Sequence, residues 1–78
     1  MRVKKPALVI TFDSTTQAMA AEQFCTEHGL PGRVIPVPRQ ISAGCGLSWK
    51  ADPAAKESLL AAMAAAGLHW ADSQVIEI

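Results

Sequence analysis

One of the two cysteines in this chain has a setting that favours covalent chemistry. Cys45 stands directly between Gly44 and Gly46. A thiolate is the form of cysteine that attacks and carries sulfur, and nearby positive charge or backbone N–H groups stabilise it. Glycines permit unusual backbone angles and close approach, so this tripeptide could aim several N–H groups at one point. Cys45 is therefore the candidate reactive residue.

A structural interpretation of Cys45 stands beside the chemical one. Cys45 could instead be a small apolar residue that begins a strand, with its glycines serving turn geometry. Ser42 could donate a hydrogen bond to a thiolate, and Arg33, Arg39 and Lys50 are close enough in sequence to supply positive charge. The residue types alone leave both interpretations open.

The second cysteine, Cys25, is expected to be an inert core thiol, because it lies among alanines in a helical segment. Cys25 and His28 are three positions apart, and Cys45 and His69 could complete a set of four zinc ligands. The spacing matches no known zinc motif, and His28 is better explained as a helix C-terminal residue. We therefore predict no metal site and no cofactor.

Three basic residues, Arg33, Arg39 and Lys50, could together bind a phosphate or a carboxylate, although a solvated hairpin face would have the same composition. RNA binding by a small sheet requires exposed aromatic residues that stack on bases. That aromatic pattern is absent, and we expect Trp49 and Trp70 to be packing residues. No nucleic-acid partner is predicted.

Hydrophobic patterning and helix caps divide the chain into six elements. A continuous apolar run indicates a central strand, and Ser14 with Gln17 forms a capping box before the first helix. Asp52 followed by Pro53 is a strong start signal for the second helix. The expected strands cover 7–12, 33–37, 45–51 and 74–78, and the last of them could begin a few residues earlier. The expected helices cover 15–28 and 54–66, with Leu59, Leu60, Met63 and Ala66 forming the buried stripe of the second helix.

This order predicts an α+β fold of the ferredoxin-like βαββαβ type, with a four-stranded antiparallel sheet and two helices on one face. The usual strand order, 4-1-3-2, places the second strand at an edge, where Pro36 is tolerated. Half of the first strand would then face the side without helices. We expect that this open face is covered by a second copy of the chain, in a homodimer.

Length and charge limit the classes of function. The chain has 78 residues and is expected to form a single domain over 1–78. Its net charge is zero, which argues against binding nucleic acid or membrane surfaces through bulk charge. No apolar run approaches the roughly 20 residues that span a bilayer, and no signal peptide is evident. These features predict a cytoplasmic protein with reduced thiols.

The segment Gly-Arg-Val-Ile-Pro-Val-Pro-Arg (32–39), followed by Ser-Ala-Gly-Cys-Gly (42–46), resembles the signature of a small bacterial family. That family, first known only as a domain of unknown function, is described as selenium/sulfur carrier protein-like. The resemblance extends over nearly the whole chain, including the apolar strand and the Ser/Thr-capped helix. It does not include Cys25.

The resemblance implies that Cys45 is a carrier thiol and that Arg39 and Ser42 have a structural or electrostatic role beside it. The protein would accept sulfur or selenium from a donor enzyme, as a persulfide or selenosulfide, and pass it to a partner. It would be a carrier rather than a self-sufficient enzyme. The alternative is a non-catalytic module that binds an anion or another protein, with a structural Cys45.

Overall fold

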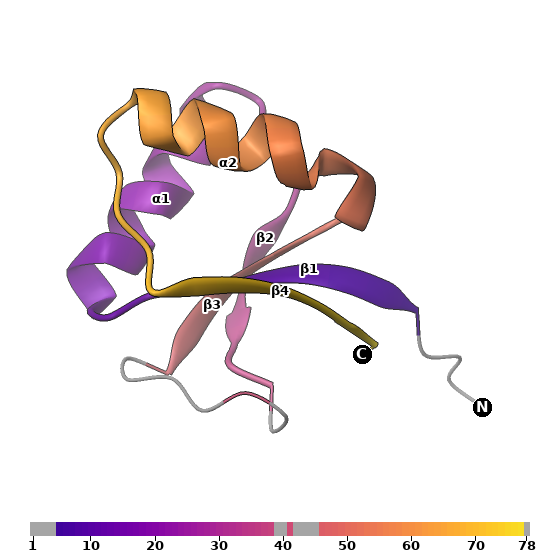
Figure 1. The fold of residues 1–78 in the computed structure, drawn as a ribbon. Helices are drawn as coiled ribbons and strands as arrows, with labels where there is room; N and C mark the ends of the chain where they lie inside the picture. The colour runs from indigo at the N-terminus through magenta and orange to yellow at the C-terminus, as the bar shows by residue number, and fades with distance from the viewer. Residues whose placement is uncertain (1–4, 39–40, 42–45, 78) are drawn as a thin grey trace.

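The computed structural model describes residues 5–38, 41 and 46–77. Within these residues the chain forms a four-stranded sheet with two helices on one face (Figure 1). The elements in chain order are β1 (Pro6–Thr11), α1 (Thr15–Glu27), β2 (Arg33–Pro36), β3 (Leu47–Ala51), a 3-10 turn (Pro53–Ala55), α2 (Lys56–Ala65) and β4 (Asp72–Glu77).

The sheet order is β2-β3-β1-β4, and every neighbouring pair is antiparallel. The predicted ferredoxin-like fold and its strand order are therefore confirmed. β2 pairs only with β3, so Pro36 lies on an edge strand, as expected from its missing N–H. β1 is central and pairs on both sides, which explains its continuous apolar sequence.

The first helix begins as its sequence predicts, with one difference in the cap. The Ser14 hydroxyl accepts a hydrogen bond from the Gln17 N–H at 3.2 Å. The Gln17 side-chain oxygen accepts from the Asp13 N–H at 3.0 Å, one residue before the usual partner in a capping box. Both side chains still satisfy backbone donors near the start of the helix.

The second helix differs from its prediction at both ends. Asp52 caps a 3-10 turn, because its carboxylate accepts from the Ala54 N–H at 2.9 Å and its carbonyl accepts from the Ala55 N–H at 2.9 Å. Regular α-helix therefore starts only at Lys56. Ala66, predicted to be buried, is exposed because it follows the last turn of α2.

Three strands also start at other residues than the first expected ones. β1 begins at Pro6, one residue earlier. β4 begins at Asp72, within the few residues before Gln74 that the sequence also allows. β3 begins at Leu47. Gly46, expected inside that strand, has φ +78°, an angle that an extended strand does not use. The expected start of this strand at Cys45 lies outside the described residues.

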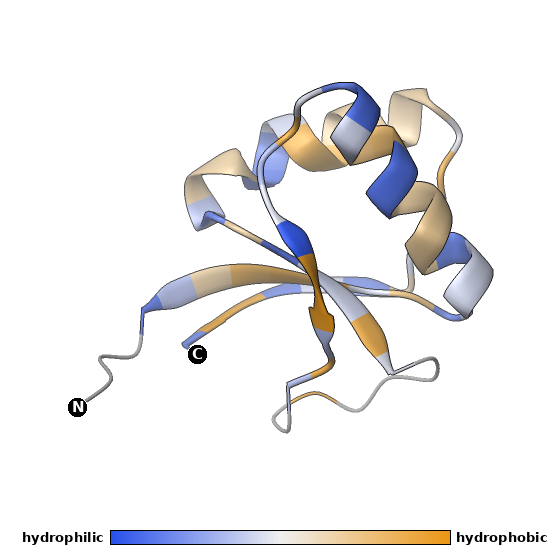
Figure 2. Ribbon diagram, turned by 180° about the vertical axis from the view of Figure 1, so that it is seen from behind, coloured by the Kyte–Doolittle hydropathy of each residue, from blue (hydrophilic) through white to orange (hydrophobic). Residues whose placement is uncertain are grey.

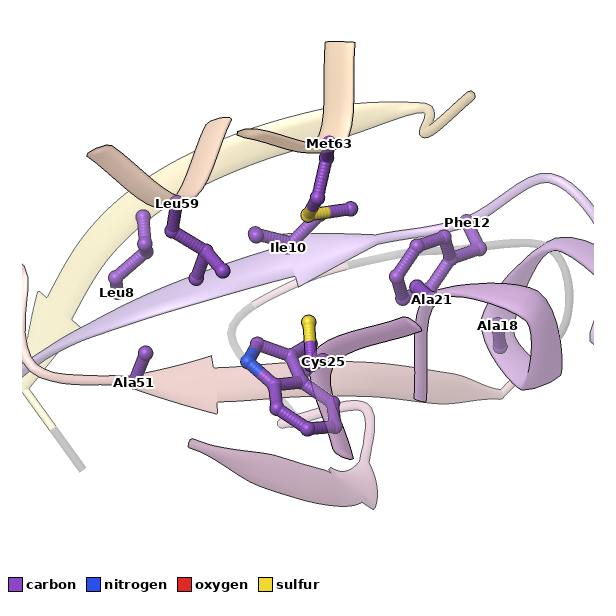
Figure 3. Packing of buried hydrophobic residues seen from close by; sticks show 10 residues of the cluster. Leu8, Ile10, Phe12, Ala18, Ala21, Cys25, Ala51, Leu59 and Met63 are labelled. Atoms are coloured by element: carbon purple, nitrogen blue, oxygen red, sulfur yellow. The ribbon is translucent and has the colours of Figure 1, made fainter. Parts of the chain in front are cut away.

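The core fills the space between the sheet and the two helices (Figure 3). Leu8, Ile10 and Phe12 point from the first strand and its end toward the helices and are fully buried. The buried members of this cluster are Leu8, Ile10, Phe12, Ala18, Ala21, Cys25, Trp49, Ala51, Leu59 and Met63. The expected packing role of Trp49 is confirmed, and Trp70 packs against the same cluster.

The other face of β1 is also buried within a single chain. Ala7, Val9 and Thr11 alternate with the core residues, yet each is at most 3% exposed. Val9 lies directly between Lys50 on β3 and Gln74 on β4. Long side chains in such positions cover apolar neighbours with their aliphatic parts. The β1 side chains on the open face are therefore buried without a second copy, and the homodimer stays a prediction.

Candidate functional site

The connection between β2 and β3 carries Cys45, and the structure describes both of its ends. Pro36 and Leu47 form the last pair of the hairpin. Beyond this pair the Val37 N–H donates to the Gly46 carbonyl at 3.0 Å. Gly46 is exposed, and a Cβ added to it would meet no atom within 4 Å. The residue that follows Cys45 in the chain is thus held at the surface, directly beside the end of the hairpin.

One residue in the middle of this connection is also described. Ile41 is 8% exposed, and its N–H donates to the Pro38 carbonyl at 3.0 Å. Ile41 does not belong to the cluster between sheet and helices. The predicted site residues Arg39, Ser42, Gly44 and Cys45 lie outside the described residues.

Arg33, which was predicted to act with Cys45, lies at the other end of the hairpin. It is the first residue of β2, three positions before Pro36, and strands rise by about 3.3 Å per residue. The Arg33 Cα therefore lies roughly 10 Å along the strand from the Pro36–Leu47 pair, after which the connection that carries Cys45 begins. The structure instead places Arg33 directly opposite Lys50. The hairpin thus brings Arg33 and Lys50 together and separates them from Gly46.

The second thiol has the properties expected of a core residue. Cys25 is fully buried on α1, as a free cysteine within the main cluster (Figure 3). Burial raises the pKa of the Cys25 thiol, because the thiolate loses its hydration inside the core. Cys25 is therefore protected from reagents and is also kept protonated.

We expect Cys25 to be alkylated about 100-fold or more slowly in the folded protein at pH 7.5 than in guanidinium, because the reagent must wait for unfolding that costs about 3–5 kcal/mol. Its raised pKa also predicts a pH effect with a definite sign. The folded state holds the proton more tightly, so this stabilisation is complete below the unfolded pKa of about 8.5 and is lost as the pH rises toward the folded value.

Urea unfolding of the wild type and Cys25→Ala at pH 7 and pH 9.5 measures this effect. The wild type is expected to lose more stability than Cys25→Ala between the two pH values. Equal losses in both proteins would contradict the protonated, buried thiol.

The histidines and acidic residues do not assemble a metal site in the described part of the chain, where no group of three or more His, Cys, Asp or Glu residues lies close enough to hold an ion. His28 caps the C-terminal end of α1 and is exposed. Its Nδ1 lies 2.9 Å from the Phe24 carbonyl oxygen, to which a protonated Nδ1 donates, and its ring lies 4.2 Å from that of Phe24.

Two features around the start of β2 are not evident from the sequence. The Trp49 indole Nε1–H donates to the Pro31 carbonyl at 3.1 Å, which fixes the turn before β2 from inside the core. A hollow of about 800 Å³ lies beside this turn, and Lys5 and Asp52 contribute to it although they are far apart in sequence. The Pro31-Gly32 pair signals a turn, but only the strand pairing shows what surrounds it.

Comparisons with known proteins give one result. A family model described as "Putative Se/S carrier protein-like" matches residues 7–73, which is most of the chain. No curated protein and no solved structure matches the chain. Among the described residues, neither helix is long and apolar enough to cross a membrane.

Proposed function

The chain belongs to the Se/S carrier protein-like family, and from this membership we propose that it carries sulfur or selenium on the thiol of Cys45. The observation that supports this choice of thiol is the burial of the other one. The chain has two cysteines, and Cys25 is fully buried with a raised pKa. A thiol that exchanges atoms with another protein needs access and thiolate character. These requirements favour Cys45.

The proposed loading step is an exchange between a donor persulfide and the Cys45 thiolate. The Cys45 sulfur attacks the outer sulfur of the donor's R–S–SH group and forms a new S–S bond. The bond between the two donor sulfurs breaks, and the donor leaves as a thiolate. Cys45 then holds a persulfide, and no external oxidant or reductant is consumed. With selenium as the outer atom the same electron count gives a selenosulfide.

Delivery reverses these roles. A thiolate of the acceptor attacks the outer sulfur or selenium, and the Cys45 thiolate leaves. Both steps require another protein to approach the thiol, and Gly46, with its open surroundings, supports such an approach. We propose that Gly44 and Gly46 leave room for the partner's sulfur.

We assign Arg39 and Ser42 the stabilisation of the thiolate, by charge and by a hydrogen bond. Arg33 begins β2, at the end of the hairpin away from Gly46, and its part in the Cys45 site stays a prediction. The proposed setting is a reducing compartment such as the bacterial cytoplasm, where both thiols remain free. The proposal includes no metal and no nucleic acid, and the homodimer through the open sheet face stays a prediction.

Intact mass spectrometry tests the proposal directly. The protein is incubated with a cysteine desulfurase and free cysteine, and we expect an adduct of about 32 Da, the mass of one sulfur atom, on the wild type and on Cys25→Ala. Cys45→Ser is expected to show none. Alkylation of Cys45 should also be rapid below pH 7, which indicates a lowered thiol pKa.

Two results would overturn the carrier function. One is an adduct that persists in Cys45→Ser. The other is a Cys45 that reacts only under denaturing conditions and forms no adduct, which would favour the alternative of a non-catalytic binding module with a structural Cys45.

A further inference from the structure

The hollow at the start of β2 lies on the helix-free side of the sheet, as the alternation of side chains shows. Val34 and Trp49 pack against the core between sheet and helices. Their chain neighbours, Arg33 and Lys50, therefore point to the opposite face. Figure 2 shows the hydrophilic start of β2, which changes to hydrophobic residues further along the strand.

Three cationic residues meet at this hollow from three segments of the chain. Lys5 precedes β1, Arg33 begins β2 and Lys50 lies near the end of β3. The acidic residue in the lining is Asp52, one of whose oxygens already caps the turn before α2. The formal charge around the hollow is thus two positive. The complete lining is Lys5, Pro6, Ala7, Pro31, Gly32, Arg33, Ile35, Lys50, Ala51 and Asp52.

The pairing of Arg33 with Lys50 is unfavourable in the free protein. Directly opposite residues of an antiparallel pair have Cβ atoms about 5 Å apart, and like charges in this arrangement repel. Among the residues that the structure describes, no carboxylate forms an ion pair with either side chain. A bound anion would convert this repulsion into attraction.

We propose that this hollow, bounded by Lys5, Arg33 and Lys50, is a binding site for the phosphate group of a small phosphorylated molecule. A phosphate monoester carries close to two negative charges above its second pKa of about 6, which balances the charge of the hollow. The planar guanidinium of Arg33 can donate hydrogen bonds to two phosphate oxygens at once, and the lysine ammonium groups act as point charges. The remaining walls, Pro6, Pro31 and Ile35, offer apolar surface to the rest of the ligand.

This site is independent of the proposed sulfur chemistry, because it lies at the opposite end of the β2-β3 hairpin from Gly46. The test is a titration followed by ¹H–¹⁵N NMR at pH 7.5, with phenyl phosphate as the probe and sodium chloride at matched ionic strength as the reference. We expect saturable shifts at Gly32, Arg33 and Lys50, and little change at Leu47.

Charge-removing variants identify the residues involved. Arg33→Gln and Lys50→Gln should each weaken phenyl phosphate binding about tenfold or more, as expected for loss of a charge-assisted hydrogen bond. Lys56→Gln removes the same charge from α2, outside the hollow, and should change affinity less than about twofold. Arg33→Gln should not lower the stability of the free protein, because it removes a repulsion.

Any one of three outcomes would contradict the proposed phosphate-binding site. Chloride could produce the same shifts, the three variants could bind equally well, or a hexaglutamate peptide could bind more tightly than phenyl phosphate. The last outcome would assign the surface to an acidic protein segment. At pH 5, where the monoester is mostly a monoanion, binding should be several-fold weaker. None of these outcomes bears on the desulfurase adduct at Cys45.

Discussion

Replacing Gly32 with alanine is expected to remove most of the stability of this protein. Gly32 has φ +114°, an angle that alanine adopts only with strain. A Cβ at this position would also lie far inside van der Waals contact with the Lys50 carbonyl oxygen and the Trp49 indole nitrogen. The first is backbone of the paired strand β3, and the second belongs to a core side chain, so neither can move cheaply.

The expected cost of Gly32→Ala is about 3 kcal/mol or more, from backbone strain of about 1–3 kcal/mol together with overpacking of about 1–3 kcal/mol. A domain of this size typically has only about 3–5 kcal/mol in total. Urea unfolding followed by Trp fluorescence measures the loss. The indole hydrogen bond to Pro31 should weaken in the same variant, which the Trp49 Nε1–H resonance reports.

Gly67 provides the matched control, because it combines a positive φ of +78° with open space where the methyl group of an alanine would lie. Gly67→Ala should therefore cost only the strain of the backbone angle, about 1–2 kcal/mol. Equal losses in the free energy of unfolding for Gly32→Ala and Gly67→Ala would show that the close approach of Gly32 to Trp49 and Lys50 adds nothing to the cost.

Replacing Phe12 with alanine is expected to have an effect of similar size for a different reason. Phe12 is completely shielded from solvent and is the largest of the fully buried side chains. Truncating a buried Phe to Ala typically costs about 3–5 kcal/mol, because transfer energy is lost and a cavity remains. That cost matches the whole stability expected for the domain, so Phe12→Ala should be largely unfolded at 25 °C.

Circular dichroism and NMR dispersion detect this loss of structure. Phe12→Leu keeps much of the volume and should remain folded, at a cost of about 1–2 kcal/mol. Met19→Ala removes a long apolar side chain that is 61% exposed on α1, and should change stability by less than about 0.5 kcal/mol. A folded Phe12→Ala with near wild-type stability would contradict the core described for this face of the sheet.

The sequence was sufficient for the order and pairing of the elements because the relevant signals are local. The apolar run of β1 and the proline in β2 together specify which strand is central and which is at an edge. The caps at Ser14 and Asp52 locate the helix starts to within a few residues. Hydrogen bonds between close neighbours determine the helix starts, and such bonds depend on residue type and short spacing.

The grouping of the charged side chains could not be predicted in the same way. Arg33 and Lys50 are 17 positions apart in the sequence, but the antiparallel register of β2 and β3 pairs them directly, at the end of the hairpin away from Gly46. The burial of Val9 could not be predicted in this way either, since the hydrophobic pattern shows only that its side chain faces away from the helices. Val9 is fully buried and lies between Lys50 and Gln74, and no local pattern reveals this register of β3 and β4.

The two outer strands have a consequence for the behaviour of the protein at high concentration. Strands at the edges of a sheet can recruit further strands and so seed aggregation. On β2 this addition is hindered by Pro36, which has no N–H to donate. On β4, a symmetric antiparallel pairing of two copies would set Asp72 of one strand opposite Glu77 of the other, at both ends of the contact. Like charges in that position repel, so this small sheet resists growth into fibres from either side.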